Sequence, residues 1–156
     1  MASTRMNAIS VPIKKLDESL DLPAYAHIGD AGLDVCAAES AVLAPFERKT
    51  VACGFSLAIP QGYAGFVLPR SGLAAKYGIS IVNAPGLIDS NYRGEIKVIL
   101  VNLDPKNPFN VSRGDRIAQI VIMETPSVSL TEVDNLSDTD RGANGFGSSG
   151  ISSIAV

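Results

Sequence analysis

Short apolar segments recur along this chain about every 8 to 12 residues, with glycine, proline and other turn-forming residues between them. The segments lie at residues 50–59, 63–68, 79–83, 95–103 and 116–124. This spacing is typical of strands in a β-sandwich or barrel, and few windows favour a helix. The chain has 156 residues, with 14 glycines and 9 prolines, which suits one compact domain. We therefore predict a single all-β domain.

Two of these segments are predicted to be central strands. Residues 95–103 are apolar and β-branched on both faces, which is the pattern of a strand buried on both sides. Residues 116–123 have a similar pattern, except that Gln119 shares a face with Ile117 and Val121. Because a buried amide without a partner is costly, Gln119 needs a polar partner there.

The other segments favour one short helix and one flexible arm. The helix is predicted at Gly72–Tyr77, with Ser71 as its N-cap and Gly78 as the residue that ends it. Towards the C-terminus the chain becomes rich in Ser, Asp and Gly, a composition that buries too little apolar area to order itself. We therefore divide the chain into a β domain, residues 1–140, and a flexible C-terminal arm, residues 141–156.

Composition limits the partners that the protein can bind. Hydrophobic residues make up 46% and charged residues 19% of the chain, and the formal net charge is -3. A mildly acidic surface does not attract a polyanion, so no nucleic-acid partner is expected. Any binding of phosphate groups must come from cations placed locally.

The cysteines and the apolar stretches set further limits. Cys36 and Cys53 form no C-x-x-C pair and His27 is the only histidine, so the sequence excludes a zinc site. We expect both cysteines to be reduced core thiols, with a disulfide as the alternative. No stretch reaches the roughly 18 apolar residues needed to span a membrane, and no signal peptide is evident. The sequence thus predicts a cytoplasmic protein without a membrane partner.

The first candidate binding segment consists of Arg70, Ser71 and Gly72. It follows an apolar strand and opens the predicted helix, so a guanidinium, backbone N–H groups and the positive end of the helix dipole converge. An anion such as a phosphate can bind at such a point. The alternative interpretation is that Ser71 only caps the helix and Arg70 lies in solvent.

The second candidate segment is a hairpin at residues 83–95 that contains Asp89 and Tyr92. A single Asp in a turn often bonds its own backbone, and an aromatic residue in a hairpin often packs across strands. A carboxylate and a flat ring three residues apart also have the chemistry of a nucleoside pocket.

Two further segments offer groups for a metal and for phosphates. Asp34 can hold Mg2+ through water, because this ion keeps much of its hydration in proteins, although it can equally be a turn residue. In the C-terminal tail, Arg141 is a cation and Phe146 an aromatic side chain. Unobstructed backbone N–H groups and hydroxyls come from Gly147, Ser148 and Ser149. The alternative is a plain disordered tail.

Taken together, these segments resemble in order and content the five motifs of the trimeric dUTP pyrophosphatase (dUTPase) family. The motifs lie at residues 30–39, 69–74, 83–98, 113–122 and 141–150. The resemblance implies a jelly-roll-like β fold and a homotrimer with three active sites between subunits, each closed by a neighbour's C-terminal arm. It also implies hydrolysis of dUTP to dUMP and pyrophosphate, which limits uracil in DNA and supplies dUMP for thymidylate synthesis.

The resemblance also implies a role for each matching residue. Asp89 would orient the attacking water, Tyr92 would lie under the deoxyribose and exclude a 2′-hydroxyl, and Asp34 would hold Mg2+ through water. The base would be bound by Asn83 and by the backbone of Leu87, Ile88 and Lys97. The inner phosphates would be bound by Arg70, Ser71, Gly72 and Gln119. The outer phosphates would be bound by Arg141, Gly147, Ser148 and Ser149, while Phe146 would cover the uracil.

Two other functions are weighed against this one. Resemblance to the related dCTP deaminase would require a Glu in the hairpin and another residue after the Arg-Ser pair, where this chain has Asp89 and Gly72. A jelly roll that binds nucleotides without turnover is the second alternative, because an intact motif can bind without catalysing. Phosphoryl transfer needs an oriented water, a metal and cations rather than a covalent nucleophile, and this chain offers those parts.

Overall fold

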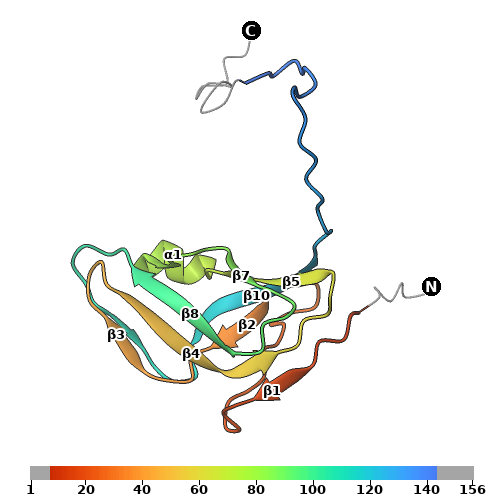
Figure 1. Ribbon diagram of the computed structural model, residues 1–156. Coiled ribbons are helices and arrows are strands. Elements are labelled where there is room, and N and C mark those ends of the chain that lie inside the picture. The colour runs from red at the N-terminus through yellow and green to blue at the C-terminus, as the bar shows by residue number, and fades with distance from the viewer. Residues whose placement is uncertain (1–7, 144–156) are drawn as a thin grey trace.

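Antiparallel strands form the body of the protein, which a computed structural model describes for residues 8–143 (Figure 1). The strands are β1 (Ile13–Lys15), β2 (Leu33–Cys36), β3 (Ala41–Leu43), β4 (Arg48–Leu57), β5 (Tyr63–Leu68), β6 (Ile79–Ile81), β7 (Gly86–Ile88), β8 (Glu95–Asn102), β9 (Phe109–Val111) and β10 (Arg116–Glu124). Helix α1 (Ser71–Tyr77) lies between β5 and β6. Two four-stranded sheets have the orders β1-β4-β8-β6 and β2-β10-β5-β7, and β3 pairs with β9. The predicted all-β architecture with one short helix is confirmed.

The hydrophobic core contains residues of all three sheets. Along β8, buried side chains alternate with less buried ones, because successive residues point to opposite faces. The largest fully buried side chains include Leu43, Ile79, Leu100, Ile117 and Ile120. The core therefore joins the sheets into one unit and leaves their outer faces for other contacts.

Strand β8 is internal to its sheet, between β4 and β6, as the sequence predicts. Its two faces differ, however. Val98 and Leu100 are buried in the core, whereas Ile99 and Val101 on the opposite face are only half-buried and Lys97 is exposed. The prediction that β8 is buried on both faces is therefore wrong for the single chain, because no second layer of described residues fully covers the outer face of this strand.

Asn102, at the end of β8, is the only buried polar residue in the described part of the chain. Its side chain is 0% exposed. The Nδ2 atom donates to Leu43 O at 3.1 Å and to Asn107 O at 2.9 Å, and Oδ1 accepts from Asp104 N at 2.9 Å. One amide thus ties β3 and the turn after β8 to the core.

Helix α1 begins one residue earlier than predicted. Arg70 has the extended backbone of an N-cap and makes no side-chain capping bond, so the prediction of Ser71 as the cap is wrong. Ser71 is already the first helical residue. At the other end, Gly78 adopts a left-handed conformation with φ 68°, which confirms it as the residue that ends the helix. No helix in residues 8–143 is long and apolar enough to cross a membrane.

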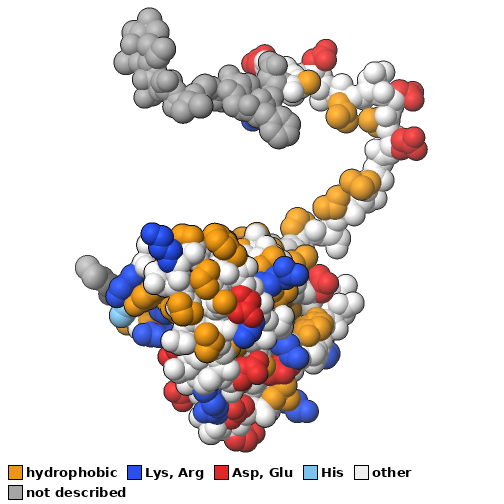
Figure 2. Space-filling view, turned by 90° about the vertical axis from the view of Figure 1, so that its left-hand side faces the viewer, with side chains coloured by type: hydrophobic (Ala, Val, Ile, Leu, Met, Phe, Trp, Pro, Cys, Tyr) orange, Lys and Arg blue, Asp and Glu red, His pale blue; other side chains and the backbone are white. Residues whose placement is uncertain are grey.

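The chain leaves the sheets directly after β10, well before residue 140. Residues 125–143 contain no strand or helix and extend away from the body (Figure 1). Figure 2 shows hydrophobic side chains along this extended segment. Two residues of the segment, Val128 and Leu130, are 75% and 94% exposed. Apolar residues at this exposure within an extended segment favour contact with another surface.

Replacing Asn102 with Ala should lower the free energy of unfolding by about 2 to 4 kcal/mol, because three backbone groups lose their partner. Urea denaturation at a fixed protein concentration measures this change. The control is Asn110→Ala on β9, where the side chain is exposed and the effect should stay within about 0.5 kcal/mol. Equal stability of the two variants would show that the Asn102 bonds do not hold the turn.

Candidate active site

The loop between β7 and β8, residues 89–94, is held in one conformation by its own hydrogen bonds. Tyr92 N donates to Asp89 O at 3.1 Å, and the Tyr92 hydroxyl donates to Glu95 O at 3.0 Å. The Arg93 guanidinium donates to Ser90 O at 2.7 Å and to Tyr92 O at 2.8 Å. Because these bonds are local, the loop does not need a ligand to place Asp89 at the end of β7.

Gly94 allows the Tyr92 ring to take its position. A Cβ atom at residue 94 would lie 2.6 Å from Cζ of Tyr92 and closer still to its hydroxyl, a separation that real Cβ atoms do not show. The ring therefore lies directly against the Gly94 backbone, and its hydroxyl donates a hydrogen bond to the carbonyl of Glu95. Tyr92 remains 45% exposed, so one side of the ring is open to a ligand.

A first cavity, of about 270 Å³, lies beside this loop. Its lining is formed by Thr50, Leu87, Ile88, Asp89, Tyr92, Glu95, Ile96, Lys97 and Ile99. Five residues that the sequence assigns to the site are thus brought together here: Leu87, Ile88, Asp89, Tyr92 and Lys97. Asn83 does not line this cavity, because it lies in the turn before β7 with its side chain against Gly86.

Strand edges give this cavity its hydrogen-bonding capacity. Among the described residues β7 pairs only with β5, so its other edge has unpaired backbone groups. The first half of β8 pairs with β4, whereas its contact with β6 begins only at Leu100. Backbone N–H and C=O groups on such edges are strong donors and acceptors that seek partners. A flat polar ligand between β7 and β8 can provide them.

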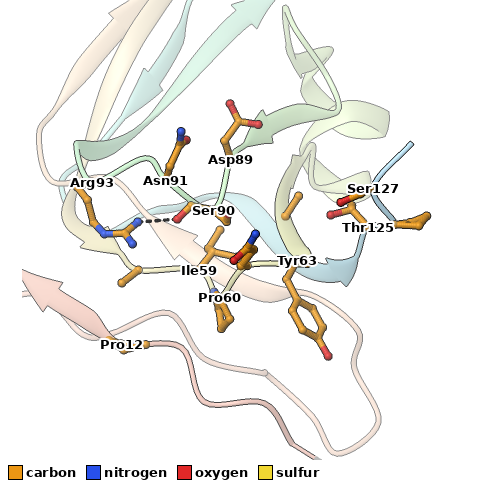
Figure 3. Close-up of a pocket in the computed structure, with 15 residues that line it drawn as sticks. Pro12, Ile59, Pro60, Tyr63, Asp89, Ser90, Asn91, Arg93, Thr125 and Ser127 are labelled. Atoms are coloured by element: carbon orange, nitrogen blue, oxygen red, sulfur yellow. Dashed lines mark hydrogen bonds between the residues drawn. The ribbon is translucent and has the colours of Figure 1, made fainter. Parts of the chain in front are cut away.

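Asp89 also lines a second, wider hollow of about 950 Å³ (Figure 3). Ile59, Pro60 and Tyr63 form part of this hollow, and the Asp89 carboxylate points away from them. The dashed line in Figure 3 marks the bond from Arg93 to Ser90. Asp89 therefore stands where two hollows meet, with its carboxylate exposed.

A third cavity, of about 600 Å³, lies at the start of α1. It brings together Asp34 and all four residues assigned to the inner phosphates: Arg70, Ser71, Gly72 and Gln119. Gln119 Nε2 donates to Pro69 O at 3.0 Å, so this residue has the polar partner that the sequence requires. His27, Asp30 and Arg116 also line the cavity.

Asp34 lies between two guanidinium groups in this cavity. Its Oδ1 is 3.3 Å from Arg70 Nε, and its Oδ2 accepts from Arg116 Nη1 at 3.3 Å. Arg70 Nη1 in turn donates to the Arg116 carbonyl at 3.1 Å. The Asp34 side chain is 18% exposed and that of Arg70 30%, so their ion pair is partly shielded from water, whereas the Arg116 side chain is 55% exposed.

This geometry fits magnesium bound to Asp34 through water. Each carboxylate oxygen has about two lone-pair sites, and each uses one for a guanidinium. The remaining sites can accept hydrogen bonds from water molecules of a hydrated ion. No group of three or more His, Cys, Asp or Glu side chains within residues 8–143 is placed to hold a metal directly.

Neither cysteine is suited to be a nucleophile. Cys36 and Cys53 are free thiols, as predicted, although Cys36 is only half-buried. Burial raises the pKa of the Cys53 thiol to about 12, and burial also raises the pKa of Cys36. Since the thiolate is the reactive form, both are unreactive near neutral pH.

The two sets of predicted residues remain apart in a single chain. The cavity of Asp89 and Tyr92 shares no lining residue with the cavity of Arg70 and Gln119. Arg141 lies in the extended segment after β10. Phe146, Gly147, Ser148 and Ser149 lie outside the described residues. One chain therefore presents two half-sites.

Sequence analysis missed three residues that shape these half-sites: Gly94, Glu95 and Arg116. Glu95 Oε1 accepts from Gly54 N at 3.0 Å and fixes the start of β8 against an irregularity in β4. Gly94 could have been found from the sequence, because a glycine two residues after an aromatic residue leaves space for the aromatic ring. The position of Arg116 depends on strand register, which the sequence does not reveal.

Comparisons with known proteins agree with this geometry. A sequence model described as dUTPase matches residues 18–150. The deoxyuridine 5'-triphosphate nucleotidohydrolase of Thermobifida fusca is 57% identical over 142 residues, covering 91% of this chain and 79% of the relative. The enzyme of the same name from Corynebacterium glutamicum is 55% identical over 141 residues, which cover 90% of this chain and 95% of the relative.

Solved structures show the same fold. The Staphylococcus bacteriophage 80alpha dUTPase with dUPNHPP has a TM-score of 0.84 and is 29% identical in sequence. The match covers 92% of this chain and 100% of the phage protein. A mutant dUTPase from phage phi11 of S. aureus has a TM-score of 0.75 and is 25% identical in sequence. The match covers 81% of this chain and 98% of the phage protein, whose structure reveals the coordination of a structural Mg(II) ion. The predicted jelly-roll-like fold is confirmed.

Replacing Gly94 with Ala should lower the free energy of unfolding by about 1 to 3 kcal/mol, because the new methyl group displaces the Tyr92 ring. In a Tyr92→Ala background the same substitution should cost less than about 0.5 kcal/mol, since the clash is gone. Urea denaturation of the four proteins measures the coupling. An equal penalty in both backgrounds would mean that residue 94 acts through its backbone and not through Tyr92.

Proposed function

Because this chain belongs to the dUTPase family, we propose that it hydrolyses dUTP to dUMP and pyrophosphate at sites completed between subunits. The observation that carries this proposal is the placement of Asp89 at the end of β7, beside the Tyr92 ring and the free edges of β7 and β8. The same family assignment disfavours the deaminase interpretation. The activity limits uracil in DNA and supplies dUMP for thymidylate synthesis.

Base and sugar binding follow from the first cavity. The backbone of Leu87, Ile88 and Lys97 supplies donors and acceptors for the uracil edge. Asn83, whose side chain lies near Gly86, binds the same edge. A cytosine presents the opposite pattern at two positions, with an acceptor at N3 and a donor at N4, and would leave buried groups unpaired. Tyr92, fixed against Gly94, lies under the deoxyribose and leaves no room for a 2′-hydroxyl.

Asp89 orients the attacking water. Its exposed carboxylate accepts a hydrogen bond from the water, whose oxygen forms a new bond to the α-phosphorus while the bond from that phosphorus to the bridging oxygen breaks. The proton passes to the carboxylate, and pyrophosphate leaves. Such a transfer is accelerated by positioning and by charge neutralisation and needs no covalent nucleophile, in keeping with the unreactive thiols.

The second half-site binds the phosphates. Arg70, Ser71, Gly72 and Gln119 bind the inner phosphates. Asp34 would hold Mg2+ through the water molecules of the ion, which would neutralise phosphate charge there. Arg141, Gly147, Ser148 and Ser149 of the arm bind the outer phosphates, and Phe146 covers the uracil.

The separation of the half-sites supports a homotrimer. A nucleotide must contact Asp89 of one subunit and Arg70 of another, because these residues line different cavities of one chain. The half-covered outer face of β8 and the exposed apolar residues Val128 and Leu130 offer surfaces for such contacts. We place the protein in the cytoplasm, where free thiols such as Cys53 stay reduced.

Replacing Asp89 with Asn should lower kcat for dUTP by at least a thousandfold while KM changes by less than about tenfold, because the carboxylate acts mainly in the transition state. Release of pyrophosphate from dUTP measures the rate. Asp104→Asn, a substitution in the turn after β8, is the control and should keep the wild-type kcat. A rate above a tenth of wild type in the Asp89 variant would remove this residue from its proposed role.

A further inference from the structure

Arg116 makes two separate contacts in the phosphate cavity, although neither the sequence nor the resemblance assigns it a role. Its guanidinium donates to Asp34 Oδ2, and its backbone carbonyl accepts from Arg70 Nη1. We propose that Arg116 is a positioning residue for phosphate binding. Its backbone carbonyl keeps the Arg70 guanidinium oriented, and its own guanidinium binds Asp34 as well, so that Asp34 does not neutralise Arg70 fully. This inference rests on the proposed function.

The contacts leave Arg70 with donors to spare. A guanidinium has five N–H donors in a fixed plane. In this structure Nε faces Asp34 Oδ1 at 3.3 Å, and one N–H of Nη1 is used by the Arg116 carbonyl at 3.1 Å. The plane of the group is therefore set at two points, and about three N–H groups stay available for an anion.

The charge balance of the cavity also depends on Arg116. The cavity is lined by two carboxylates, of Asp30 and Asp34, and by two guanidiniums, of Arg70 and Arg116. Without Arg116 the carboxylates would outnumber the cations and the cavity would repel phosphate. Asp34 would then pair with Arg70 alone, which would neutralise the group that is to bind the substrate.

Strand register explains why residue 116 can reach Asp34. Arg116 is paired with Cys36, and the register between β10 and β2 shifts between Arg116 and Ala118. This irregularity lets Arg116 and Gln119 line the same cavity, whereas a regular strand would point residues three positions apart to opposite faces. The irregularity thus adds a cation to the cavity without lengthening a loop.

The chain offers a matched control in Arg113. This residue lies in the turn before β10 and its Nη2 pairs with Asp17 Oδ2 at 2.6 Å and donates to Ser19 Oγ at 2.6 Å. It lines none of the three cavities described above. Replacing Arg113 therefore removes the same charge and an ion pair of the same type from outside the site.

The test compares Arg116→Gln, Arg116→Lys and Arg113→Gln with the wild type. Steady-state hydrolysis of dUTP gives kcat and KM, inorganic pyrophosphate gives an inhibition constant, and thermal unfolding reports folding. Arg116→Gln should raise both KM and the pyrophosphate inhibition constant about tenfold, whereas Arg113→Gln should change each less than about twofold. Arg116→Lys should recover only part of the loss, because an ammonium group cannot replace the planar fork.

A double variant tests whether Arg116 acts through Arg70. In an Arg70→Gln background, Arg116→Gln should lower kcat/KM by less than about threefold, because the group it positions is absent. If Arg116→Gln is too unstable to assay, Arg116→Lys supplies the same comparison. Wild-type values of KM and of the inhibition constant in a folded Arg116 variant would overturn the inference. A wild-type protein that does not hydrolyse dUTP would instead overturn the proposed function.

Discussion

Unpaired strand edges at β7 and at the first half of β8 are the constraint on which the site depends. Among the described residues, β7 pairs only with β5 and the first half of β8 only with β4, so each has one edge with unpaired backbone groups where the base is proposed to bind. The loop between these strands is fixed by its own bonds, and Gly94 lets the Tyr92 ring lie close to the backbone. This part of the proposed site is therefore formed by two strands and a loop that holds itself through local hydrogen bonds.

The phosphate half-site follows a different principle. Here the important groups are charged, and a single half-buried carboxylate, Asp34, is shared by Arg70 and Arg116. Sharing keeps the cations in place without fully neutralising either of them. The same arrangement leaves Asp34 able to accept hydrogen bonds from hydrated Mg2+.

Sequence patterns predicted much of this fold because they depend on local chemistry. Turn residues between apolar segments located β4, β5, β6, β8 and β10 but not β1, β2, β3, β7 and β9. Gly78 marked the end of α1, and the need of Gln119 for a partner was met by Pro69. Other features could not be predicted because they depend on distant residues. The exposed outer face of β8 depends on which layers cover it, and the role of Arg116 depends on an irregular register with β2. The assignments in the arm stay predictions.

Activity of mixed trimers tests the shared site most directly. Asp89→Asn and Arg70→Gln subunits, carrying different tags, are co-expressed, and trimers that contain both are purified and confirmed by light scattering. Each such trimer has one interface at which an intact Asp89 meets an intact Arg70, so it should show about one third of wild-type activity while each variant alone is nearly inactive. Mixed trimers as inactive as their parents would contradict a site completed between subunits.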